Sequence, residues 1–143
     1  MESLTDPVLG ELRWEAPFSW WFTQIRLASG EWLDVIIDPG DKGPLAFVGR
    51  AARLYSRAME AEQEILGQAI ESGLLDLYNQ WRQEDERQMT PEEVKNQLAL
   101  TFVRIDTVTP ITLSYDAGDR FGGHSVDVKV DERFQATGVT LVG

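Results

Sequence analysis

Two runs rich in aromatic and β-branched residues surround a short turn in the stretch Phe18-Ser19-Trp20-Trp21-Phe22-Thr23-Gln24-Ile25-Arg26-Leu27-Ala28-Ser29-Gly30-Glu31-Trp32-Leu33-Asp34-Val35-Ile36-Ile37. This pattern predicts two strands, Phe18–Leu27 and Trp32–Ile37, joined at Ala28-Ser29-Gly30. A two-residue turn would place Ile25 opposite Asp34 and mix apolar and charged side chains on one face. A three-residue turn with its glycine in the left-handed conformation produces one apolar face, so we expect that register.

The three-residue turn assigns each side chain of this hairpin to one of two faces. On the apolar face we expect Ile25 opposite Leu33, Thr23 opposite Val35 and Trp21 opposite Ile37. On the other face we expect Arg26 opposite Trp32, Gln24 opposite Asp34, Phe22 opposite Ile36 and Trp20 opposite Asp38. If helices cover the apolar face, three large aromatic side chains share the opposite one and form a patch that usually indicates a partner, a ligand or a second covering layer.

The hairpin extends into a three-stranded meander that ends before a helical region. A strand over Leu9–Trp14 precedes the turn Glu15-Ala16-Pro17, and the turn formers of Asp38–Pro44 end the sheet. The apolar period then changes to 3.6, which predicts a long amphipathic helix from Leu45 to about Glu71. A shorter helix over Leu74–Trp81 is expected after it.

The strongest local signal is Thr90-Pro91-Glu92-Glu93, which combines a capping hydroxyl, a proline at the first helical position and a glutamate that closes a capping box. It predicts a third helix that ends near Ala99. The remaining runs predict a second group of strands, at Phe102–Val108, Ile111–Tyr115, His124–Val130 and Val139–Val142.

The element order predicts a single α+β domain over residues 1–143, in which an antiparallel β-meander, two to three helices and then a second group of antiparallel strands pack as sheet against helices. The pattern allows the two groups of strands to form one sheet or two, with helices on either side of the first.

Composition narrows the classes of function. The chain has 143 residues, 13 basic and 24 acidic side chains, a net charge of −11 and no cysteine. Such a charge disfavours nucleic-acid and anionic-membrane binding and favours a basic protein partner. The chain has no apolar run long enough to cross a bilayer, and residues 1–12 lack the features of a signal peptide, so a cytoplasmic location is expected.

The only histidine, His124, follows a glycine-rich loop that contains Asp116 and Asp119. One interpretation makes His124 a general base oriented by either carboxylate, or makes the three residues a metal site, as in a small hydrolase or metal-dependent enzyme. The other makes the glycines a tight turn in which the imidazole hydrogen-bonds the backbone. The structural interpretation is favoured, because the sequence shows no hydroxyl or thiol nucleophile beside His124 and no regular spacing of metal ligands. We therefore expect neither a metal nor a cofactor.

Three arginines, Arg50, Arg53 and Arg57, recur at helical intervals along one side of the long helix. They suit a clamp for a phosphate or a carboxylate. In the simpler interpretation, Arg53 and Arg57 are neutralised by acidic neighbours such as Glu60 and Glu64, or by the acidic sheet.

Two segments resemble small acidic bacterial domains of unknown function: the opening Asp6-Pro7-Val8-Leu9-Gly10-Glu11-Leu12-Arg13-Trp14, and Phe121-Gly122-Gly123-His124-Ser125-Val126-Asp127-Val128-Lys129-Val130-Asp131. The resemblance implies an α+β bacterial cytoplasmic domain. Some such domains look like those encoded near polymorphic toxin systems, where immunity proteins occur. It assigns no catalytic or binding residue.

The leading prediction is a non-enzymatic domain, of immunity type or otherwise, that recognises a basic protein. Its predicted partner-binding residues are Trp20, Phe22, Arg26, Trp32 and Asp34. The alternatives are the enzyme centred on His124 and a homodimer formed through the aromatic face.

Overall fold

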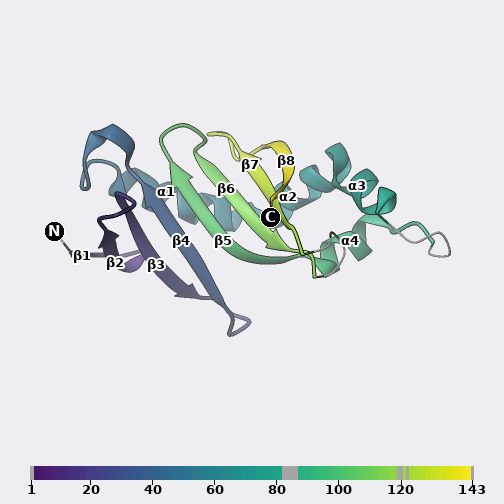
Figure 1. Cartoon of the computed structure of the whole chain (residues 1–143), viewed down its shortest axis with the longest axis horizontal. Helices are drawn as coiled ribbons and strands as arrows, with labels where there is room; N and C mark the ends of the chain where they lie inside the picture. The colour runs from purple at the N-terminus through teal and green to yellow at the C-terminus, as the bar shows by residue number, and fades with distance from the viewer. Residues whose placement is uncertain (1, 82–86, 119–120, 122, 143) are drawn as a thin grey trace.

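Eight strands form one sheet in chain order, from β1 at one edge to β8 at the other (Figure 1). This computed structural model describes residues 2–81, 87–118, 121 and 123–142. The strands are β1 (Ser3–Asp6), β2 (Gly10–Glu15), β3 (Trp20–Arg26), β4 (Trp32–Asp38), β5 (Ala99–Asp106), β6 (Ile111–Asp116), β7 (Ser125–Val130) and β8 (Ala136–Val142).

The β3–β4 hairpin has the predicted register. Its pairs are Trp21 with Ile37, Phe22 with Ile36, Thr23 with Val35, Gln24 with Asp34, Ile25 with Leu33, and Arg26 with Trp32. The turn is closed by two backbone hydrogen bonds, from Leu27 N–H to the Glu31 carbonyl (2.8 Å) and from Gly30 N–H to the Leu27 carbonyl (2.9 Å). Gly30 has a φ of 91°, in the region that a residue with a Cβ avoids, so the glycine permits this turn.

The predicted fold class is wrong in its arrangement of the strands. The α+β prediction separated an antiparallel meander from a second antiparallel group, with both packed against helices. The structure instead joins them in one mixed sheet, because β4 pairs with β5 in parallel, with Val35 beside Val103 and Ile37 beside Ile105. A parallel pair needs a long crossover, and the helical segment between β4 and β5 supplies it. The short edge strand β1 was not predicted at all.

The crossover is divided into more pieces than the sequence predicted. It contains a 3₁₀ turn (η1, Gly40–Lys42), α1 (Val48–Glu60), α2 (Glu62–Ala69), a π-helical turn (η2, Ile70–Leu74), α3 (Leu75–Gln80) and α4 (Pro91–Gln97). The single long helix expected over Leu45–Glu71 begins later and is interrupted at Ala61, which leaves helical geometry with φ −97° and ψ 3°. The last helix ends at Gln97, and β5 begins at Ala99, where that helix was expected to end.

Of the helices, α1 and α2 pack on one face of the sheet, while α3 and α4 contact the helical turn η2 and lie to the right of the strands in Figure 1. In Figure 1, α1 and α2 lie behind the strands; α1 contacts β5 and β6, and α2 contacts β7 and β8. The core between these layers combines the inward side chains of the strands with the apolar stripe of the helices. Its fully buried members include Leu12, Trp21, Leu33, Val35, Ile37, Ala51, Ala58, Ile65, Val103, Ile105, Leu113, Val126 and Val128. The apolar face of the predicted hairpin is therefore the face that the helices cover.

The predicted capping box begins α4. The Thr90 hydroxyl accepts a hydrogen bond from Glu93 N–H (3.3 Å), and Thr90 N–H donates to Glu93 Oε1 (3.1 Å). Arg87 donates two hydrogen bonds to the same carboxylate, at 2.7 and 2.5 Å. These bonds, first those from Arg87 and then that from the Thr90 backbone, lower the pKa of Glu93 to about 2. The carboxylate is therefore ionised at neutral pH, as this cap requires.

We expect Thr90→Ala to lower the free energy of unfolding by about 1 kcal/mol, because it removes the acceptor for one N–H of the first helical turn. Urea denaturation monitored by circular dichroism measures the change. Thr140→Ala, at an exposed position on the edge strand β8, is the matched control. Equal losses in the two variants would show that the cap adds no stability of its own.

Candidate functional site

The second face of the sheet is turned away from the helices, and we call it the open face. It faces the viewer in Figure 1, in front of the helices. Strand alternation and register place these side chains on it: Arg13, Glu15, Trp20, Phe22, Gln24, Arg26, Trp32, Asp34, Ile36, Asp38, Phe102, Arg104, Asp106, Thr112, Ser114, Asp116, Ser125, Asp127 and Lys129. None of the described helices packs over it.

Trp20 is held in a single orientation near one end of the open face. Its ring stacks on Phe18 with a centroid distance of 4.7 Å and an interplanar angle of 13°. Its indole N–H donates to Glu15 Oε1 at 2.8 Å, and the Arg104 guanidinium carbon lies 5.3 Å from its ring centroid. Contacts of three kinds thus hold the ring in place, and a side chain that is already ordered loses less entropy in any binding event.

Arg104 connects this aromatic group to the strand pair that joins the two halves of the sheet. Its guanidinium donates to Asp38 Oδ2 at 2.8 Å and to Asp106 Oδ2 at 3.2 Å. Asp38 ends β4, and Asp106 is its partner at the end of β5, so the arginine lies between two carboxylates of the parallel pair.

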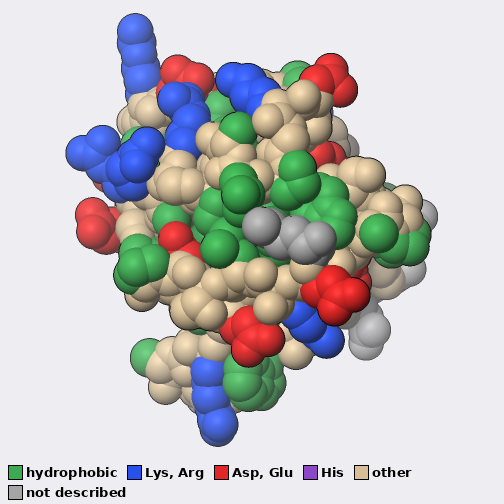
Figure 2. All heavy atoms as spheres, turned by 90° about the vertical axis from the view of Figure 1, so that its left-hand side faces the viewer, with side chains coloured by type: hydrophobic (Ala, Val, Ile, Leu, Met, Phe, Trp, Pro, Cys, Tyr) green, Lys and Arg blue, Asp and Glu red, His purple; other side chains and the backbone are tan. Residues whose placement is uncertain are grey.

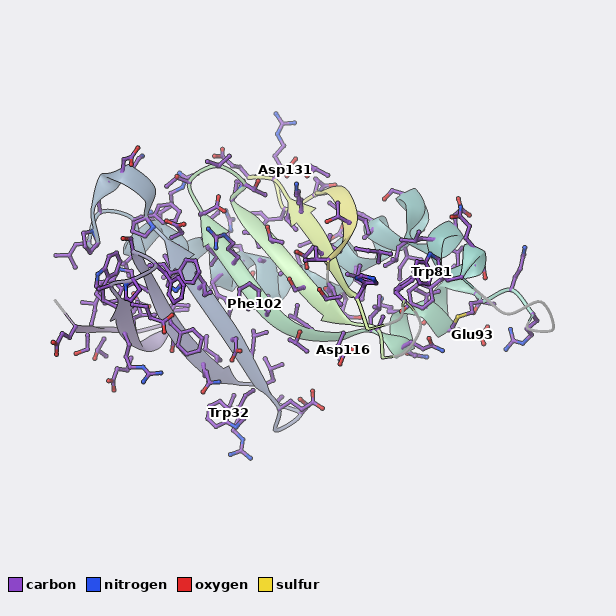
Figure 3. The ribbon with its side chains drawn as sticks, in the orientation of Figure 1. Trp32, Trp81, Glu93, Phe102, Asp116 and Asp131 are labelled. Atoms are coloured by element: carbon purple, nitrogen blue, oxygen red, sulfur yellow. The ribbon has the colours of Figure 1, made fainter. Side chains whose placement is uncertain are left out.

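Trp32 is the most exposed aromatic ring of the open face, and its side chain extends from the β3–β4 hairpin (Figure 3). The residue is 57% exposed, and the guanidinium of its cross-strand neighbour Arg26 lies 5.7 Å from the ring centroid. The next pair, Gln24 and Asp34, is joined by a hydrogen bond of 2.8 Å. The arginine covers part of the ring, and the rest of the ring is open to solvent.

Two further aromatic rings, those of Phe22 and Phe102, also belong to the open face. The guanidinium carbon of Arg13 lies 5.8 Å from the centroid of the Phe22 ring. Phe22 is the cross-strand partner of Ile36. Phe102 of β5 lies beside Asp34 of β4 and is half-buried (Figure 3). The structure therefore places all five predicted partner-binding residues, Trp20, Phe22, Arg26, Trp32 and Asp34, on one face.

Sequence reasoning missed Phe102 and Arg104 as members of this surface. Both are on β5, which joins the first hairpin only through the unpredicted parallel pairing with β4. The sequence did contain one signal: Phe102, Arg104 and Asp106 alternate with the buried Val103 and Ile105. Such alternation separates the two faces of a strand, but it does not identify the strand that pairs with it.

Of the charged side chains named above on the open face, six are acidic and four, including Lys129, are basic. Its arginines are engaged: Arg13, Arg26 and Arg104 each lie over an aromatic ring. Carboxylates recur along the strands, at Glu15, Asp34, Asp38, Asp106, Asp116 and Asp127. Asp127 accepts a hydrogen bond of 2.7 Å from the buried Ser114 hydroxyl. Figure 2 shows that charged side chains of both signs also border a hydrophobic patch at the β1 end of the molecule.

The loop before β7 does not assemble the predicted histidine site among the described residues. Asp116 accepts a hydrogen bond from Gly118 N–H (2.8 Å) and so closes a turn, and no hydrogen bond joins it to His124 in the described ranges. Asp119 lies outside the described residues. His124 Nδ1 is buried with no hydrogen-bond partner in the part of the chain that the structure describes, so the expected imidazole–backbone bond at this nitrogen is not seen there.

Phe121 has a clear structural role in the same loop. Its buried ring makes edge contacts with Tyr78 (4.7 Å) and Trp81 (5.3 Å), which tie the loop to α3. The described residues include no group of three His, Asp or Glu side chains placed to hold a metal ion.

The predicted arginine clamp lines a hollow on the outer side of α1. Arg50, Arg53 and Arg57 border a cavity of about 530 Å³ together with Glu132 and Phe134 of the β7–β8 turn. Arg50 forms an ion pair of 2.9 Å with Glu132. Among the described residues, neither Arg53 nor Arg57 forms an ion pair with Glu60 or Glu64, the neighbours expected to neutralise them.

Comparison with known proteins assigns the chain a family. The sequence model of a family described as "Uncharacterized protein conserved in bacteria (DUF2262)" matches residues 6–139. No curated protein and no solved structure is significantly similar to the chain. In the described ranges, no helix has the length and apolar character needed to span a membrane.

Proposed function

The chain belongs to this uncharacterised bacterial family, and we propose that it is a non-enzymatic interaction domain that binds a basic protein through the open face of its sheet. The observation that carries the proposal is the sheet itself. The helices pack on one side, and the other side presents fixed aromatic rings among carboxylates. An aromatic surface rimmed by charge is typical of a protein interface.

The two kinds of side chain have different roles in this mechanism. The rings of Trp20, Phe22 and Trp32 supply the buried apolar area, and such aromatic anchors contribute most of the affinity at interfaces. Carboxylates such as Asp34 and Asp127 attract the lysines and arginines of the partner, which raises the rate of encounter more than the lifetime of the complex. The net charge of −11 adds to this attraction over a longer range.

The resemblance to domains encoded near toxin systems suggests one form of this function. An immunity-type protein binds a toxin and blocks it, and an acidic, aromatic surface is complementary to a basic toxin. The proposal requires no catalytic residue and no cofactor, and it leaves the loop before His124 with a structural role.

We expect Trp32→Ala to weaken binding of the partner by about tenfold or more, mainly through faster dissociation, because an exposed aromatic anchor is lost while the fold is kept. The partner is first captured from a bacterial lysate on the immobilised chain and then purified, and association and dissociation rates are measured by surface plasmon resonance. Trp20→Ala is expected to act in the same direction.

Leu45→Ala is the control, since Leu45 is 56% exposed but lies in the crossover between η1 and α1, outside the open face. Raising the salt concentration from about 50 mM to about 500 mM should slow association without changing dissociation. Binding that is unaffected by Trp32→Ala and by salt would overturn the proposal. A dimer seen by light scattering that Trp32→Ala converts to monomer would instead assign the open face to a second copy of the chain.

A further inference from the structure

The hollow beside α1 supports a second, independent site. It lies beside α1, and its walls come from α1, the β1–β2 turn and the β7–β8 turn. We propose that this hollow binds a small organic phosphate, with the phosphate groups held by Arg50, Arg53 and Arg57 and the organic group against Phe134.

The size and the lining of the hollow suit a small molecule. Its volume of about 530 Å³ falls in the range of ligand pockets in proteins, roughly 300–1,000 Å³. Apolar side chains form part of its wall, with Val8, Ala52 and Leu54 contributing beside the ring of Phe134. A ligand with both an apolar and an anionic part therefore has a surface for each.

The charges of the hollow oppose those of the rest of the molecule. Its lining contains three arginines and one glutamate, whereas the whole chain has a net charge of −11. Arg53 forms no ion pair in the described ranges. Arg50 pairs with Glu132, but their side chains are 51% and 69% exposed, and such a pair is weak enough for a ligand to replace it.

Guanidinium groups at this spacing match a phosphate better than a carboxylate. Each guanidinium can donate two parallel hydrogen bonds, and a phosphate has three free oxygens and more negative charge to receive them. Residues three and four positions apart on a helix lie on the same side, so α1 directs Arg50, Arg53 and Arg57 toward one region.

Phe134 gives the hollow its second kind of contact. Its φ of 61° is in the left-handed region, where a phenylalanine is strained. The turn keeps it there through Asp131, whose carbonyl accepts from Phe134 N–H (3.0 Å) and whose carboxylate accepts from Gln135 N–H (3.0 Å). The Arg57 guanidinium lies 5.8 Å from the ring centroid, so the ring and the cation are placed together. A planar ligand group can stack on this pair.

The test uses ADP and inorganic pyrophosphate as probes, titrated separately into the full chain by isothermal calorimetry. We expect saturable binding of ADP that is about tenfold tighter than that of pyrophosphate, because only ADP can contact Phe134. Arg53→Gln should weaken both probes by about tenfold or more, since it removes a charged donor. Phe134→Leu should reduce the affinity for ADP to that for pyrophosphate.

Lys42→Gln is the control for the loss of one positive charge, because Lys42 is exposed in η1, outside both the hollow and the open face. It should leave both affinities unchanged, and circular dichroism confirms that each variant is folded. The proposal is overturned if neither probe binds saturably, if Arg53→Gln binds like the original chain, or if pyrophosphate binds as tightly as ADP. None of these outcomes depends on a protein partner at the open face.

Discussion

Replacement of Trp21 with alanine is expected to lower the free energy of unfolding by about 3–5 kcal/mol, a large part of the stability of a domain of this size. The ring is fully buried between the sheet and the crossover. Its indole N–H donates to the Pro44 carbonyl at 2.7 Å, and its ring makes an edge contact with Trp14 at 5.1 Å. The substitution creates a cavity and removes the donor to this carbonyl. Urea denaturation monitored by far-ultraviolet circular dichroism measures the loss.

Trp32→Ala is the control for this experiment, because Trp32 belongs to the same hairpin but is directed to the open face. We expect Trp32→Ala to lower the free energy of unfolding by about 1 kcal/mol or less, since more than half of the residue is already exposed to water. The two faces of the hairpin would be wrongly assigned if Trp32→Ala cost as much as Trp21→Ala.

The second large effect is expected at the loop before β7, where Phe121→Ala should lower the free energy of unfolding by about 3–5 kcal/mol. The Phe121 ring is fully buried and fits between the edges of Tyr78 and Trp81, so its loss detaches the loop from α3. The measurement is the midpoint and slope of urea denaturation, compared with those of the unchanged chain.

His124→Ala separates the structural interpretation of this loop from the chemical one. If Phe121 anchors the loop and His124 only follows it, we expect His124→Ala to change stability by about 1 kcal/mol or less. Addition of divalent metal ions should not raise the melting temperature of the unchanged chain. A rise that His124→Ala abolishes would restore the metal-site hypothesis, and a small effect of Phe121→Ala would remove the anchor.

Local features of the fold were predictable because neighbouring residues decide them. The register of the β3–β4 hairpin follows from its turn and from the need for one apolar face. The start of α4 follows from the capping box, in which Thr90 and Glu93 satisfy each other's backbone N–H groups. The interruption at Ala61 was less accessible, because the apolar stripe continues through it from α1 into α2.

The candidate site was predictable only in part, for the same reason. The hairpin register alone places Trp20, Phe22, Arg26, Trp32 and Asp34 on one face. The contacts that orient them depend on other strands: Arg104 over Trp20 comes from β5, and Arg13 over Phe22 comes from β2. Likewise, the helical spacing predicted the row of arginines on α1, whereas Glu132 and Phe134 come from a turn about eighty residues away.

The sequence by itself determined the composition of both faces of the first hairpin, the helix start at Thr90 and the strongly acidic character of the chain. Tertiary structure decided that β4 and β5 lie side by side in parallel, which turns two groups of strands into one sheet with an open face. The reason is physical. Alternation specifies which side of a strand is buried, but the backbone hydrogen bonds that pair strands are the same for every sequence, so packing of the crossover helices selects the neighbour.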